Sequence, residues 1–185
     1  MKKIIFPIAM LILIVACQDQ NETTEPLEGR GNTTTVSGQT MPSEFADPKY
    51  MDMGKQLMQQ FADENIDAYG EHFADNAVYL WSSGDSLTGK QAIVDYWKQR
   101  FTNVIDTIRM SNDIWLPIKV NQPQQGPDMP GVWLIGWHQV NVKYKNGKEL
   151  QFWVHTDYHY NESDKIDRAI QYLDRAPINA ALGTK

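Results

Sequence analysis

The chain contains 185 residues, carries a formal net charge of −6 and has a single cysteine. Acidic side chains outnumber basic ones, 23 to 17, and the basic residues form no cluster, so the composition argues against nucleic acid as a partner. One cysteine excludes a disulfide within the chain and a metal site built from several cysteines.

The N-terminal segment 1–17 has the pattern of a secretory signal peptide. Lys2 and Lys3 precede the apolar run 4–16, which is shorter than the about 20 residues that a membrane-spanning helix needs. The ending IVAC at Cys17 is similar to the lipobox of bacterial lipoproteins, whose cysteine is acylated. We therefore expect a lipidated Cys17 and a protein held in the bacterial cell envelope, on the periplasmic side or at the cell surface. A short membrane anchor with an incidental cysteine is the alternative.

Residues 18–46 differ in composition from the rest of the chain. They are rich in Thr, Gln, Gly and acidic side chains and contain few apolar residues that could pack. Such a segment cannot bury enough surface to offset its conformational entropy, so we expect a disordered acidic tether. The remainder, 47–185, has the size of one ordinary domain.

The domain is predicted to begin with helices. Asp47 and Pro48 are typical of a helix start, and apolar residues follow at three-to-four spacing. A short helix is expected over 65–73, a strand over 76–81 and a third helix over 89–101.

Strands dominate the second half of the chain. A Pro/Gln/Gly-rich loop separates the first two of them, and the dipeptide Asn146–Gly147 predicts a tight hairpin turn between the second and third. This order predicts an α+β domain in which helices cover one face of a curved antiparallel sheet. The four expected strands are 106–120, 132–144, 149–160 and 165–174.

The motifs FADNAVYLW, GKQAIVDYW, KNGKELQFWV and DKIDRAIQYLD, spread over 50–175, resemble the nuclear transport factor 2-like superfamily. That superfamily includes SnoaL-like polyketide cyclases and ketosteroid isomerases. The resemblance implies a cone-shaped fold in which about three N-terminal helices and the concave sheet face enclose an apolar pocket. The convex face would commonly be a dimer interface. The superfamily contains enzymes and non-catalytic binding modules, so the fold alone does not decide the function.

Two histidines and an aspartate could form a cluster on the predicted hairpin. A two-residue turn would pair Lys145 with Lys148 and place His138 opposite His155, next to Asp157. A histidine oriented by a carboxylate can act as a general base, and the same three groups could also ligate a metal.

The resemblance assigns these residues to faces of the sheet. Counted along the motifs, the three catalytic positions of ketosteroid isomerases fall on Leu57, Trp81 and Thr156, none of which can abstract a proton. Catalysis of that type is therefore not expected. The face of Thr156 would line the pocket, and the row containing His155 and Asp157 would point outward.

The implied pocket has aromatic walls and a few neutral hydrogen-bonding groups, which suit a flat, uncharged ligand. A core filled by side chains is the alternative. The expected pocket residues are Tyr79, Trp81, Trp97, Trp137, Gln139, Asn141, Phe152, Val154, Thr156, Tyr158, Gln171 and Leu173.

These patterns predict a lipid-anchored SnoaL-like domain that binds a small apolar or aromatic ligand. We expect no cofactor and no metal, and a homodimer formed through the outer sheet face. The alternative is an acid–base enzyme of the isomerase, cyclase or dehydratase type that uses His138, His155 and Asp157. A solvated rim is the simplest interpretation of Asp167, Arg168, Asp174 and Arg175.

Overall fold

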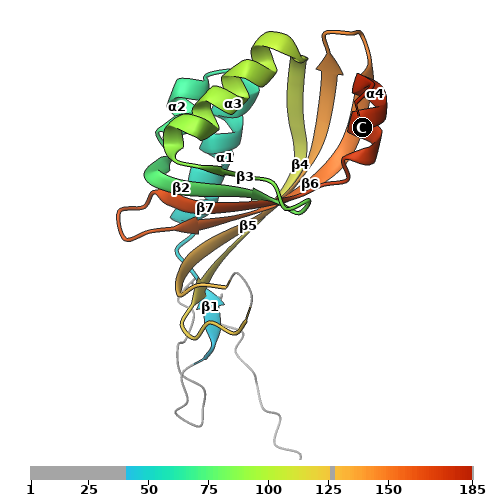
Figure 1. Cartoon of the computed structure of the whole chain (residues 1–185). Coiled ribbons are helices and arrows are strands. Elements are labelled where there is room, and N and C mark those ends of the chain that lie inside the picture. The colour runs from blue at the N-terminus through green and yellow to red at the C-terminus, as the bar shows by residue number, and fades with distance from the viewer. Residues whose placement is uncertain (1–40, 126–127, 185) are drawn as a thin grey trace, which may run out of the picture.

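The computed structural model describes residues 41–125 and 128–184, which form a curved sheet with helices packed mainly on one side (Figure 1). Its helices are α1 (Lys49–Ala62), α2 (Ile66–Gly70), α3 (Lys90–Asn103) and α4 (Ala176–Leu182). Its strands are β1 (Ser43–Phe45), β2 (Phe73–Trp81), β3 (Ser86–Thr88), β4 (Ile105–Val120), β5 (Gly131–Tyr144), β6 (Glu149–Tyr160) and β7 (Ile166–Tyr172).

The α+β fold class is confirmed, together with the predicted meander of strands β4 to β7. The sheet has the order β1-β4-β5-β6-β7-β2-β3. It is mixed rather than purely antiparallel, because β2 lies parallel to β7, with Tyr79 opposite Ala169. The sequence predicts the strands, but it does not show that the last strand of the meander, β7, pairs with β2.

Three short elements were not predicted. Strand β1 lies inside the segment expected to be a disordered tether, and it pairs with the end of β4 through Phe45 and Ile118. Strand β3 pairs with β2, and α4 follows β7 at the C-terminal end. Elements of this length carry too few residues for a periodic pattern to identify them.

The predicted signal peptide, Cys17 and the tether as far as residue 40 lie outside the described residues. In the part of the chain that the structure describes, no helix is both long and apolar enough to cross a bilayer.

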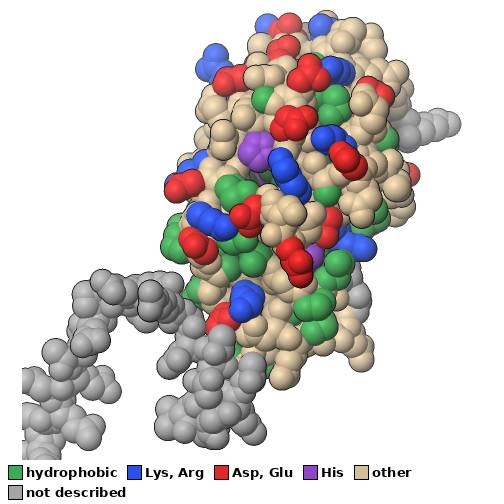
Figure 2. Space-filling view, turned by 90° about the vertical axis from the view of Figure 1, so that its left-hand side faces the viewer, with side chains coloured by type: hydrophobic (Ala, Val, Ile, Leu, Met, Phe, Trp, Pro, Cys, Tyr) green, Lys and Arg blue, Asp and Glu red, His purple; other side chains and the backbone are tan. Residues whose placement is uncertain are grey.

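The helices are held by apolar stripes that face the sheet. On α1, Tyr50, Leu57 and Phe61 are buried at the spacing expected for one helix face. The charged side chains of α1 remain outside, and Figure 2 shows both signs interspersed over one face of the molecule. Lys49 and Asp164, 2.7 Å apart, are one such pair.

The indole of Trp115 packs between α1 and the sheet. A Cβ atom built on Gly136, its cross-strand partner, would lie 2.5 Å from the Trp115 ring, and one on Gly54 of α1 would lie 3.1 Å from it. Only glycine at position 136 leaves room for the Trp115 ring, because real Cβ atoms do not approach another carbon atom so closely. Gly136 therefore makes space for the Trp115 ring.

The predicted hairpin register is wrong by one residue. Tyr144 donates its N–H to Lys148 O and accepts from Gly147 N–H, each at 2.8 Å, which closes a three-residue loop instead of the predicted two-residue turn. Gly147 adopts φ 83°, the left-handed conformation that such loops require at their last residue. Trp137 consequently lies opposite His155, and His138 lies opposite Val154.

Candidate functional site

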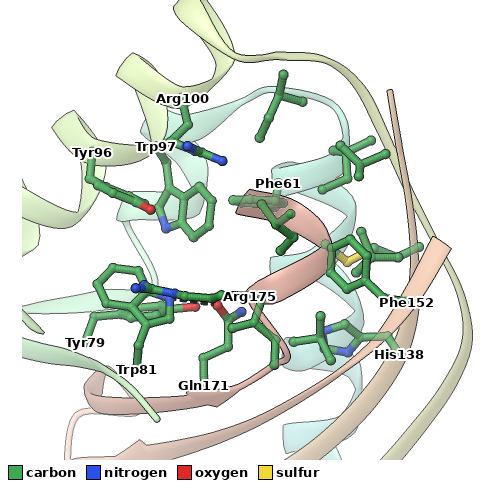
Figure 3. A pocket seen from close by; sticks show the side chains of 18 of the residues that line it. Phe61, Tyr79, Trp81, Tyr96, Trp97, Arg100, His138, Phe152, Gln171 and Arg175 are labelled. Atoms are coloured by element: carbon green, nitrogen blue, oxygen red, sulfur yellow. Dashed lines mark hydrogen bonds between the residues drawn. The ribbon is translucent and has the colours of Figure 1, made fainter. Parts of the chain in front are cut away.

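A cavity of about 270 Å³ lies between the concave sheet face and the four helices described above. Figure 3 shows side chains from α3, from strands β2 and β7 and from the opposite part of the sheet converging on it. Helix α4 contributes Ile178 and Leu182 on one side. The aromatic residues that line the cavity are Phe61, Tyr69, Tyr79, Trp81, Tyr96, Trp97, Tyr144, Phe152 and Tyr158.

Most of the residues predicted for the pocket line this cavity. Thr156 faces the same side but is fully buried and is not part of the wall. The predicted residues found in the wall are Tyr79, Trp81, Trp97, Phe152, Val154, Tyr158, Gln171 and Leu173.

Trp137, Gln139 and Asn141 require a correction, because they lie on the opposite, outer face of the sheet. A register shift of one residue moves the side chains of one strand to the other face relative to its partner. On that face Asn141 accepts a hydrogen bond from Gln151 Nε2 at 2.6 Å, and Gln139 accepts one from Asn112 Nδ2 at 3.0 Å.

The predicted cluster of His138, His155 and Asp157 does not form. His138 points into the cavity, whereas His155 and Asp157 lie on the outer face, with His155 Nε2 3.0 Å from Asp157 Oδ1. The His155 ring packs between Trp137 and Tyr172, at centroid distances of 4.6 and 5.3 Å. Among residues 41–125 and 128–184, no group of three potential ligands is placed to hold a metal ion.

His155 and Asp157 remain on the outer face as a pair. Burial raises the pKa of Asp157, and the neighbouring His155 partly opposes this effect. Without His138 beside them, these two groups do not provide the acid–base constellation that the sequence suggested.

His138 is the one histidine of the described residues that lines the cavity, although it was not among the pocket residues predicted from the sequence. Its side chain is 2% exposed, and its ring lies 5.7 Å from that of Trp115. Burial, reinforced by the positive charge that His155 can carry, lowers the pKa of His138 to about 4. The imidazole is therefore neutral at neutral pH, and its Nδ1 has no hydrogen-bond partner among the described residues.

One polar corner of the cavity is built around Trp81. Its Nε1 donates to Gln171 Oε1 at 3.0 Å, and the guanidinium of Arg175 lies 5.4 Å from its ring centroid. Arg175 also forms an ion pair with Asp85, and the arginine lowers the pKa of that carboxyl. Arg175 is thus part of the wall, which corrects its interpretation as a solvated rim.

A second cation, Arg100, was not predicted. It lies in the last turn of α3, three residues after Trp97, and therefore on the same helix face. That spacing is the signal that could have found it. In Figure 3 its side chain extends from α3 alongside Trp97 into the cavity. Burial raises the pKa of Tyr144, and the charge of Arg100 opposes the increase.

The wall can bind and orient a molecule, but it holds few groups that could move a proton at neutral pH. Burial raises the pKa values of Tyr69, Tyr79 and Tyr158, so their hydroxyls stay protonated. Leu57 and Trp81 occupy two of the carried-over catalytic positions and lack acid–base chemistry in this range.

The comparisons with known proteins agree with this architecture. The SnoaL-like domain family matches residues 52–114. No curated protein is similar enough in sequence to match the chain. A candidate isomerase from Bacillus subtilis has a TM-score of 0.57 and 15% identity, over 73% of this chain and 93% of its own.

Two further solved structures show the same arrangement of elements. A nuclear transport factor 2-like protein of unknown function from Burkholderia pseudomallei has a TM-score of 0.56 and 11% identity, over 71% of this chain and 95% of its own. A candidate polyketide cyclase from Xanthomonas campestris has a TM-score of 0.53 and 10% identity, over 71% and 95%. The chain thus has the nuclear transport factor 2-like fold. Its match to the SnoaL-like family confirms the resemblance seen in its motifs.

Proposed function

We propose that the chain is a ligand-binding SnoaL-like domain whose cavity holds a small apolar or aromatic molecule. The observation that carries the proposal is the cavity of about 270 Å³ with aromatic side chains on several walls. Concave, mostly apolar sites with a few polar groups are typical of small-molecule binding. A completely filled core would leave no such space.

Binding is favoured over acid–base catalysis by the residues in the wall. No Asp or Glu side chain of the described residues lines the cavity. His138 is the only imidazole there among those residues, and its lowered pKa of about 4 makes it a weak base.

Native mass spectrometry of residues 41–185 tests the proposal. This fragment contains every helix, strand and core residue that the structure describes, so it holds the complete described fold. We expect an adduct of low mass that is lost on denaturation. In Leu173→Trp a larger side chain enters the wall, and the adduct should be reduced several-fold. Gln91→Trp, at an exposed position of α3 outside the wall, is the matched control.

Circular dichroism would establish that both variants fold. Unchanged adduct levels in Leu173→Trp would contradict binding in this cavity. Equal losses in both variants would do the same, because only one of the substitutions alters the wall.

We further propose that the domain is anchored by a lipid on Cys17 in the bacterial cell envelope. The support is the signal-like segment that ends at this cysteine. Expression of the whole chain in bacteria with labelled palmitate should label the protein and direct it to the membrane fraction. Cys17→Ala should abolish both effects, and label that persists in this variant would contradict the proposal.

A second copy of the chain is the partner we propose for the outer sheet face. Ile114, Trp137, His155 and Tyr172 are cross-strand neighbours there and form one row across β4 to β7. Ile114 is 51% exposed and Tyr172 is 40% exposed, which is unusual for large apolar side chains on an open face. The native mass spectra report the mass of the assembly, and a purely monomeric species at micromolar concentration would contradict this pairing.

A further inference from the structure

The charged groups in the cavity wall are all of one sign. Arg100 and Arg175 line the cavity, and His138 can only add positive charge. Within the described residues no carboxylate joins them. An apolar cavity with low-dielectric walls strengthens the field of such charges, because water does not screen them as it does at the surface.

The two arginines differ in how far their charge is compensated. Arg175 pairs with Asp85 and lies over the ring of Trp81. Arg100 forms no ion pair with any described residue, and its buried Nε has no hydrogen-bond partner among them. Arg100 is half-buried in the wall, and a carboxylate in the cavity would supply the partner that its guanidinium lacks among the described residues.

The charged groups of the wall are hydrogen-bond donors only. Arg100 and Arg175 can donate but cannot accept, and no carboxylate of the described residues lines the cavity. A ligand that brings acceptor oxygens would pair with these guanidinium groups, whereas one that brings only donors would not.

We propose that the natural ligand is an apolar or aromatic acid whose carboxylate, or an equivalent oxyanion, binds Arg100. The inference rests on the proposed function and narrows the class of ligand. The rings of Trp97 and Phe61, 4.7 Å apart, lie near Arg100 and would hold the apolar part of the ligand. The acidic end would then form charge-assisted hydrogen bonds with the planar guanidinium.

A series of probes with one shape and three charges tests this proposal. Binding of 2-naphthoate, 2-naphthamide and 2-naphthylmethylammonium to residues 41–185 would be measured by isothermal titration calorimetry at pH 7.5. We expect the carboxylate to bind about tenfold more tightly than the neutral amide, and the ammonium to bind more weakly than either.

Variants then identify the group responsible. Arg100→Gln should remove the preference for the carboxylate over the amide, while Arg109→Gln, at an exposed position of β4, should leave it unchanged. Arg100→Lys keeps a positive charge at this position and should retain part of the preference. It therefore distinguishes the loss of the charge from a folding defect caused by replacing Arg100. The preference is the ratio of the affinities of one protein for the carboxylate and for the amide. A general loss of binding lowers both affinities and leaves this ratio unchanged.

The outcomes separate the two proposals. If the amide binds as tightly as the carboxylate, or if the preference survives in Arg100→Gln, the acidic ligand is excluded and the binding cavity stands. If none of the three probes binds, and a matched benzoate series also fails, both proposals are overturned.

Discussion

As the pH falls from 6.5 to about 4, His138 alone is expected to lower the free energy of unfolding by roughly 3 kcal/mol. Burial disfavours its charged form, so the folded protein binds the proton only near pH 4, while the unfolded chain binds it near 6.5. Between these values the unfolded state carries more protons, and acid therefore favours unfolding. The contribution is fully present above pH 6.5 and is lost as the pH approaches 4.

The effect is isolated by comparing variants, because carboxylates titrate over the same range. Urea unfolding from pH 7 to 4 would be measured for the wild type and for His138→Leu. The stability of the variant relative to the wild type should increase as the pH falls. Gln139→Leu, on the outer side of the same strand, should show a difference independent of pH. A parallel pH dependence of the wild type and His138→Leu would show that His138 is not buried as described.

Gly136→Ala is expected to lower the free energy of unfolding by about 3 kcal/mol, although alanine normally stabilises a strand relative to glycine. The new Cβ would lie 2.5 Å from the Trp115 ring. The ring cannot retreat freely, because Gly54 of α1 also approaches it and Trp115 is only 8% exposed. Chemical unfolding at neutral pH measures the loss.

A double-mutant cycle tests the cause of this loss. Trp115→Leu creates space beside Gly136, so Gly136→Ala should cost much less in that background than in the wild type. A Gly136→Ala protein as stable as the wild type would show that the indole does not occupy this place. Equal losses in both backgrounds would locate the strain elsewhere.

Long elements with a clear pattern were predictable from the sequence. Strand β6 has the predicted bounds, and the three N-terminal helices and the meander lie close to the expected positions. Their apolar periodicity reflects burial on one face, which local sequence records well. The parallel pairing of β2 with β7 depends on contacts between distant segments, and no local pattern encodes it.

The candidate site shows how one turn controls many side chains. The side chains of β6 that point into the cavity were correctly assigned from the resemblance, since Phe152, Val154 and Tyr158 line it. The side chains of β5 that point into the cavity were inferred from the register of the hairpin. That register depends on the loop length, and Asn–Gly is compatible with both two- and three-residue loops. The one-residue error moved His138 out of the expected cavity and placed Trp137 inside it.

The cations were missed for a different reason. Arg175 lies just before the short helix α4, and only the packing of that helix brings it to the cavity. Arg100 follows Trp97 at helical spacing, but charged residues on a helix usually face solvent. The acidic ligand that we propose differs from the uncharged one expected from the sequence because these two side chains lie in the wall.

Strand β1 fixes the place at which the N-terminal segment joins the domain. It pairs with Ile118 of β4, whereas the cavity is lined by Ile108 of the same strand, about 30 Å away at the usual strand rise. In Figure 1, β1 accordingly lies at the opposite pole from α3 and α4. The chain segment that leads to the lipid proposed for Cys17 would therefore enter the domain at the end far from the cavity, and the cavity would stay clear of this attachment.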